Sequence, residues 1–135
     1  MRTSINTTKA IYWTATGLFA LMMTGSAVAY LTSPDMAKAF VHLGFPAYFR
    51  VELAVAKLLG VVALLAPVPK LLKEWAYAGF AITLVSAFVS HAAVDGPQTG
   101  IPPLVGLGIL LLSYTFLHRL EKRTASTAVL QDALM

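Results

Sequence analysis

Residues 47–66 read AYFRVELAVAKLLGVVALLA and form the most informative segment of the chain. The segment is long and apolar enough to cross a bilayer, which takes about 20 residues of helix. It nevertheless contains Arg50, Glu52 and Lys57. A charged side chain at the centre of a membrane helix costs about 2.5–3.5 kcal/mol to insert, so such residues usually face the protein interior and mark functional sites. Lys57 lies about ten residues from either end, near the expected midplane.

The composition is that of an integral membrane protein. Of the 135 residues, 58% are hydrophobic and 12% charged, whereas soluble domains carry about 25% charged residues. The net charge of +4 does not indicate a nucleic-acid partner, because the basic residues gather at the ends of apolar segments. The chain has no cysteine, which excludes disulfide chemistry, iron–sulfur clusters and thiolate zinc sites.

The pattern predicts an all-α polytopic membrane protein with four transmembrane helices in an up-down bundle. The expected spans are residues 10–31, 47–66, 75–94 and 102–118. They form a single membrane domain, residues 1–123, followed by a polar and mobile C-terminal tail, residues 124–135. Ala27-Val28-Ala29 resembles a signal-peptidase site, but the preceding apolar run is longer than that of a usual signal peptide, so we favour a retained first helix.

A short helix is expected between the first two spans. Ser33-Pro34-Asp35 has the residues of a helix start: a serine N-cap, a proline in the first turn and an acid beside it. An amphipathic run follows and is stopped by Gly44 and Pro46. We therefore predict an interfacial helix over residues 34–43 that lies on the membrane surface.

The distribution of basic residues predicts the orientation, because cytoplasmic loops of membrane proteins are enriched in lysine and arginine. One side carries Arg2, Lys9, Lys70, Lys73, Arg119, Lys122 and Arg123. The other side has only Lys38 and Arg50. We expect the protein to lie in the inner membrane of a bacterium, with both termini on the cytoplasmic side. The imbalance also argues against a dual-topology multidrug exporter.

Several strings resemble the DoxX-like family of small bacterial membrane proteins. They are Gly44-Phe45-Pro46, then Glu52 and Lys57, the run KEWAYAGF at residues 73–80, and Ser90-His91. The resemblance covers about residues 8–120. It implies a four-helix membrane bundle. The family takes its name from a subunit of a thiosulfate:quinone oxidoreductase, and most members have no established activity, so the resemblance assigns no catalytic residue.

Polar residues near the outer ends of two spans are candidates for proton chemistry. Counted at 1.5 Å per residue, Glu52 lies about 9 Å and His91 about 6 Å from the outer end, on helices that a short turn makes antiparallel neighbours. Asp95 follows His91 by one turn, and Arg50 lies at the same level. These residues can form one polar cluster, either functional, with His91 titrating near neutral pH, or purely structural.

Lys57 lies deeper, about 16 Å in, at the level of Tyr114 in the fourth span. A contact between Lys57 and Tyr114 would satisfy both polar groups. Lys57 and Arg50 are seven residues apart and therefore share one helix face. The functional interpretation makes Lys57 the floor of a ligand cavity that binds a polar headgroup such as a quinone carbonyl. In the alternative, the lysine stem packs and its amine bonds to hydroxyl and carbonyl groups.

Three functions remain open at this stage. The first is a protein that holds a quinone-like or lipid-like molecule, with or without a role as redox-partner subunit; Arg50, Asp95, Lys57 and Tyr114 would bind the ligand. The second is an isomerase-like enzyme in which Glu52 or His91 moves the proton. The third is a structural or assembly partner with no ligand. The lipid bilayer is the expected environment and a homodimer is possible. We expect no haem, since only His91 lies within a span.

Overall fold

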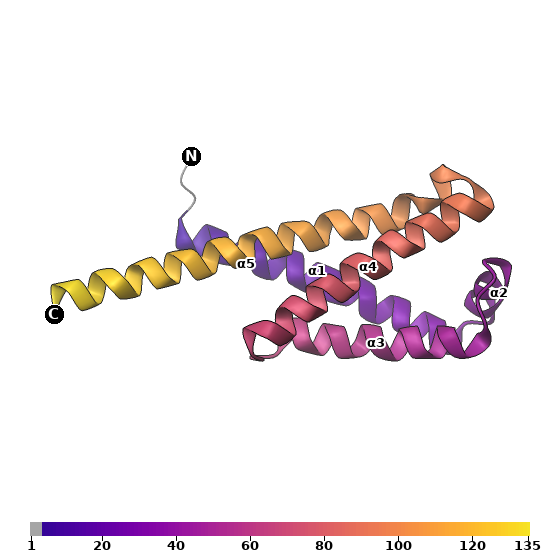
Figure 1. Cartoon of the computed structure of the whole chain (residues 1–135), viewed down its shortest axis with the longest axis horizontal. Helices are drawn as coiled ribbons and strands as arrows, with labels where there is room; N and C mark the ends of the chain where they lie inside the picture. The colour runs from indigo at the N-terminus through magenta and orange to yellow at the C-terminus, as the bar shows by residue number, and fades with distance from the viewer. Residues whose placement is uncertain (1–3) are drawn as a thin grey trace.

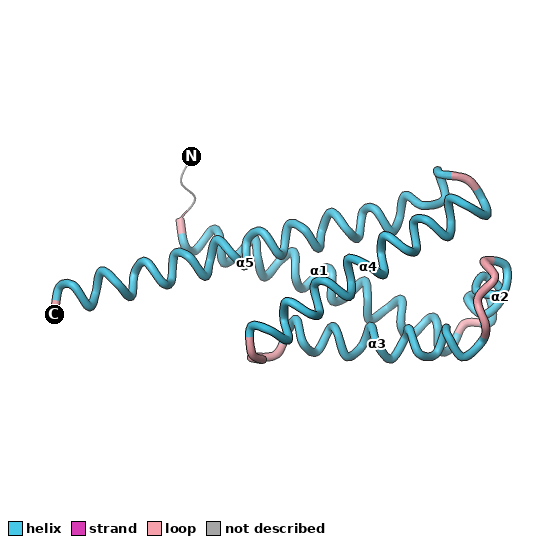
Figure 2. Tube along the Cα trace, viewed as in Figure 1, coloured by secondary structure: helices cyan, strands magenta, loops and turns pink. Residues whose placement is uncertain are grey.

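The structure, a computed structural model, describes residues 4–135 and is built from helices joined by short turns (Figures 1 and 2). The helices are α1 (Ile5–Thr32), α2 (Pro34–His42), α3 (Ala47–Leu65), α4 (Lys70–Asp95), the 3-10 helix η1 (Pro97–Gly100) and α5 (Ile101–Leu134). No strand occurs within residues 4–135. The predicted all-α class is therefore confirmed. Arg2, one of the basic residues used to predict the orientation, lies outside the described residues.

Local sequence signals set the helix boundaries between α1 and α3. Ser33 caps α2 by accepting a hydrogen bond from the backbone nitrogen of Met36 at 3.5 Å, and Pro34 occupies its first turn. Gly44 follows α2 with φ of 88°, a left-handed conformation that favours glycine and ends the helix. A short helix is thus present where the sequence predicts one. Its location at a membrane surface stays a prediction.

The four longer helices form a ring and run alternately in opposite directions (Figure 1). Helix α1 packs against α3 and α5, and α4 packs against the same two helices. The backbones of α1 and α4 are therefore diagonal, as are those of α3 and α5. Side chains fill the centre, where the ring of Phe19 on α1 meets the edge of Phe80 on α4 with a centroid separation of 5.0 Å. Close van der Waals packing of such side chains holds the four helices together.

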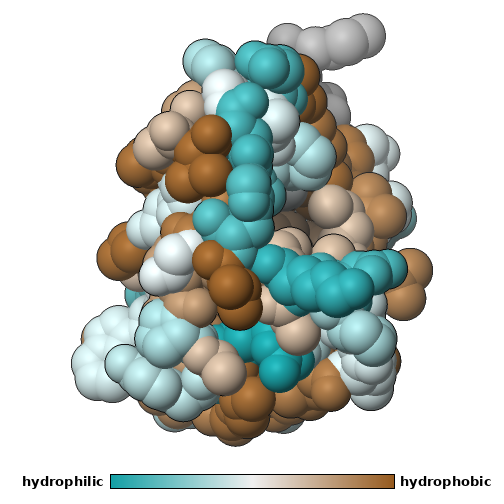
Figure 3. Space-filling view, turned by 90° about the vertical axis from the view of Figure 1, so that its right-hand side faces the viewer, coloured by the Kyte–Doolittle hydropathy of each residue, from teal (hydrophilic) through white to brown (hydrophobic). Residues whose placement is uncertain are grey.

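Among the described residues, three segments are long and apolar enough to cross a membrane: α1, α4, and the run from Pro97 to Leu134 that contains α5. Helix α3 is not among them. It has 19 residues, and Arg50, Glu52 and Lys57 lie within its length. The chain is thus a membrane protein by its apolar helices, and the predicted count of four spans is not shown. Figure 3 looks onto the end that carries α2, where hydrophilic side chains cross an otherwise mixed surface.

The C-terminal segment differs from the prediction. Helix α5 continues to Leu134, well past the expected end of the span at residue 118, and residues 124–135 are exposed. Its last turns project beyond the other helices (Figure 1). After Gly108 the sequence contains neither glycine nor proline and is rich in good helix formers, so nothing in it ends the helix. The segment expected to be a polar, mobile tail is helical, and more than half of its residues are apolar.

Candidate functional site

Lys57 is buried between helices and is held by α1. Its side chain on α3 is only 6% exposed. The Nζ atom donates to Ser26 Oγ at 2.8 Å and to Tyr30 Oη at 2.9 Å, and it lies 4.0 Å from the centroid of the Tyr30 ring. Hydroxyls and an aromatic face both stabilise a buried ammonium group. Ser26 and Tyr30 are four residues apart on one face of α1. Sequence reasoning missed both partners, and this spacing is the signal that could have revealed them.

The predicted contact between Lys57 and Tyr114 is wrong. Tyr114 donates instead to Glu74 Oε2 at 3.0 Å. The reason lies in the order of the helices around the ring, because α3 and α5 are diagonal and Tyr114 turns toward α4. Counting residues from the ends of a span gives the depth of a side chain, but it does not say which helices are neighbours.

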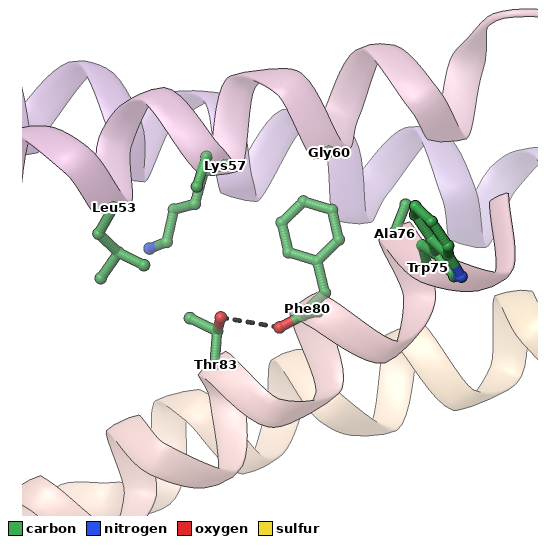
Figure 4. Close-up of a pocket in the computed structure, with 9 residues that line it drawn as sticks. Leu53, Lys57, Gly60, Trp75, Ala76, Phe80 and Thr83 are labelled. Atoms are coloured by element: carbon green, nitrogen blue, oxygen red, sulfur yellow. Dashed lines mark hydrogen bonds between the residues drawn. The ribbon is translucent and has the colours of Figure 1, made fainter. Parts of the chain in front are cut away.

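A cavity of about 180 Å³ lies between α3 and α4 beside Lys57. Its walls include Leu53, Lys57 and Gly60 from α3 and Trp75, Phe80 and Thr83 from α4. In Figure 4 the Lys57 side chain reaches from α3 into the space between the two helices, with Leu53 beside it and Thr83 opposite. The wall is mainly apolar. Lys57 supplies its one charge.

The Lys57 ammonium has unused binding capacity. It carries three N–H donors, and two of them bond to Ser26 and Tyr30. Within residues 4–135 the third has no acceptor in the structure. Across the cavity, Thr83 Oγ1 donates to the carbonyl of Gly79 at 2.8 Å, which leaves its oxygen free to accept a bond. The cavity therefore offers a donor and an acceptor to a polar headgroup.

Arg50 lies two turns before Lys57 on α3 and contacts the same residue of α1. Its Nη1 atom donates to the backbone carbonyl of Tyr30. Both cations of this helix face therefore reach Tyr30, as their seven-residue spacing predicts. Neither forms an ion pair within the described chain.

The expected cluster of Glu52, His91 and Asp95 does not form. Asp95 Oδ1 lies 2.7 Å from Nε2 of His42, at the end of α2. Glu52 is exposed, and neither it nor the His91 side chain has a hydrogen-bond or ion-pair partner in residues 4–135. The reason is that α2 brings His42 to Asp95, while Glu52 faces outward from α3. Neither Glu52 nor His91 lines the cavity, so their catalytic roles stay predictions.

A second polar cluster, which sequence reasoning missed, joins α4 to α5 at the opposite end of the molecule. Glu74 binds Tyr114, and its Oε1 atom lies 3.1 Å from Nε2 of His118. The latter two atoms are not aligned as a hydrogen bond, so their attraction depends on protonation of the ring. His118 Nδ1 is 3.5 Å from Glu121. The spacing of Tyr114, His118 and Glu121 along one face of α5 is the signal for this cluster. Within residues 4–135 no three His, Asp or Glu side chains are placed to hold a metal ion.

Buried hydroxyl groups connect α1, α4 and α5 in the core. Ser113 Oγ lies 2.6 Å from Thr16 Oγ1 and 2.7 Å from Tyr77 Oη. The Tyr12 hydroxyl lies beside Thr16 and Tyr77 but is aligned with neither, and it has no hydrogen-bond partner among the described residues. The three bonded hydroxyls satisfy one another away from water, as buried polar groups must.

One comparison with known proteins, against models of protein families, finds the family that the sequence resembles. No curated protein and no solved structure is detectably similar to this chain. The model of the DoxX-like family matches residues 14–113, which include Lys57, its partners on α1 and the whole cavity. Because the match covers most of the chain, the protein belongs to the DoxX-like family.

Proposed function

We propose that this DoxX-like protein crosses the membrane four times and binds a small hydrophobic molecule, quinone-like or lipid-like, in the cavity beside Lys57. The observation that carries the proposal is a buried lysine on the wall of an apolar cavity with one donor unused. Ligand sites are commonly apolar clefts with a few polar groups that orient the ligand. An ionisable residue inside a membrane protein is by default a candidate for function.

Helix α3 is the fourth span in this proposal. Its 19 residues extend about 28 Å, close to the hydrocarbon thickness of a bilayer. Lys57, its deepest charge, is buried and bonded to α1, so it is shielded from lipid. Arg50 and Glu52 lie in the first two turns, where long side chains can reach the headgroup region.

The same topology gives the orientation. The basic residues around the turn between α3 and α4 and near residues 119–123 mark the cytoplasmic side of a bacterial inner membrane. Both termini then lie in the cytoplasm, and α2 lies on the outer surface. A protein that holds a hydrophobic molecule between its helices can serve as the membrane subunit of a redox enzyme. It can assemble with such a partner subunit or with a second copy of itself. The acid–base alternative gains no support, because Glu52 and His91 lie away from the cavity wall.

Native mass spectrometry of the detergent-purified protein tests the proposal. We expect the wild type to retain a discrete hydrophobic adduct that the Lys57→Met variant loses. Lys38→Met removes the same charge from the exposed α2 helix and serves as the matched control, which should keep the adduct. A wild type without any adduct, or an adduct of equal abundance on the Lys57→Met variant, contradicts binding at Lys57.

A further inference from the structure

We infer that the molecule held beside Lys57 is a single-chain amphiphile with an anionic headgroup, a carboxylate or a phosphate. This inference rests on the proposed function, since it names the class of ligand for the same cavity. It depends on a separate observation: within residues 4–135 neither Lys57 on the cavity wall nor Arg50, two turns before it on α3, has an acidic partner.

None of the carboxylates of the described chain pairs with Lys57 or Arg50. Asp95 pairs with His42, while Glu74 and Glu121 lie at the opposite end of the molecule. Glu52 is exposed and unpaired within residues 4–135. Lys57 is 6% exposed, and both of its bonds go to neutral hydroxyls. A buried cation without a counter-charge is strongly unfavourable, so an anion that reaches its third N–H would bind with a large electrostatic advantage.

Arg50 strengthens the preference for an anion. It also bonds to a neutral group, the carbonyl of Tyr30, and has no ion pair in the described structure. At seven residues from Lys57 it lies about 10 Å nearer the outer end of α3. Two cations in succession along one face attract an anion toward the cavity and repel a cationic headgroup. A quinone carbonyl would occupy the free donor of Lys57 and leave both charges unbalanced.

The cavity also sets the size of the headgroup. Its volume of about 180 Å³ is smaller than that of common ligand sites, which measure about 300–1,000 Å³. That volume suits a carboxylate or phosphate with the first few methylenes of one chain. Ala56 and Gly79 line the cavity and are exposed, so the rest of the chain can leave between α3 and α4. A two-chain phospholipid would have to bring its glycerol backbone to the depth of Lys57.

A series of amphiphiles tests the inference on the wild-type protein, and all of them except the quinone have the same oleyl chain. Oleate, oleyl phosphate, oleyl alcohol, methyl oleate and decylubiquinone are titrated into the detergent-purified protein at about pH 9, well above the usual carboxyl pKa. Binding is followed by the change in tryptophan fluorescence, since Trp75, one of the two tryptophans, lines the cavity. We expect oleate or oleyl phosphate to bind at least about tenfold more tightly than the alcohol and the ester, as charge-assisted bonds are stronger than neutral ones. The tighter of the two anions then identifies the headgroup.

Other outcomes separate this inference from the proposed function. If the alcohol, the ester or the quinone binds as tightly as oleate, the anionic headgroup is refuted and the cavity at Lys57 is retained. If no member of the series binds, the proposed function fails as well. In the Lys57→Met variant the preference for oleate over the alcohol should fall to about onefold, whereas Lys38→Met should keep it. The wild-type series decides the inference even if Lys57→Met does not fold.

Discussion

Substitution of Gly60 by alanine tests both the packing of α3 against α4 and the cavity between them. A Cβ atom at this position would lie 2.6 Å from Cε2 and 2.7 Å from Cζ of Phe80. Carbon atoms in contact are about 3.5–4.0 Å apart, so the ring must move by about 1 Å. It cannot move freely, because Phe80 is 4% exposed and its ring packs against Phe19, which is fully buried. The remaining direction is into the cavity that Phe80 lines.

The magnitude follows from two opposing effects. Overpacking of a filled core costs about 1–3 kcal/mol, while alanine in place of glycine favours a helix by up to about 1 kcal/mol. We expect the Gly60→Ala variant to lose about 0–2 kcal/mol of unfolding free energy. Gly108 provides the matched control, because a Cβ there meets no atom within 4 Å. The Gly108→Ala variant should gain up to about 1 kcal/mol, so the two variants should differ by about 1–3 kcal/mol.

Equilibrium unfolding in mixed micelles with increasing SDS, followed by far-UV circular dichroism, measures this difference. The Gly60→Ala variant should also bind the proposed amphiphile more weakly, since Phe80 then takes up part of the volume of the cavity beside Lys57. Equal stabilisation of the Gly60 and Gly108 variants, with ligand binding unchanged, would refute the close approach of Phe80 to α3.

Two further predictions concern the core and the topology. Tyr77→Phe removes a hydroxyl that bonds to Ser113 and should lower the free energy of unfolding by about 1–3 kcal/mol in the same assay. Tyr12→Phe removes a hydroxyl with no partner in the described chain and should be neutral or stabilising. Equal losses of stability in the two variants would contradict the hydrogen-bond assignment. The chain has no cysteine, so single introduced cysteines report its topology. In intact cells an impermeant maleimide should label the Lys38→Cys variant, and it should label the Lys70→Cys variant only after permeabilisation. Labelling of both variants in intact cells would show that α3 does not cross the membrane.

The sequence predicts helix identity well in this protein, because local signals determine it. Long apolar runs predict α1, α4 and the apolar part of α5, and Ser33 with Pro34 predicts the start of α2. The basic residues at 119–123 predict the end of the span, but they do not predict that α5 continues to Leu134. Residues 119–134 mix charged, polar and apolar side chains and contain neither glycine nor proline. Polarity predicts exposure, and it does not by itself predict the end of a helix.

The candidate site was predicted only in part, because its partners depend on the arrangement of the helices. Burial of Lys57 follows from the cost of exposing a charge to lipid. The identity of its partners does not, since depth along a span is the same whichever helix lies beside it. Tyr114 has a suitable depth but lies on the diagonal helix, whereas Ser26 and Tyr30 lie on a neighbouring one.

The two buried polar layers of this protein differ in a way that separates structure from function. The rings of Phe19 and Phe80 lie between them. On one side, Ser113 and its two hydroxyl partners bond to one another and join three helices, and the Tyr12 hydroxyl beside them is neutral although it is unpaired within residues 4–135. On the other side, Lys57 keeps a donor without an acceptor, has no counter-charge in the described chain and borders a cavity. A layer that served stability alone would gain from filling that cavity and removing that charge. The unfilled side is therefore the one that we propose as the ligand site.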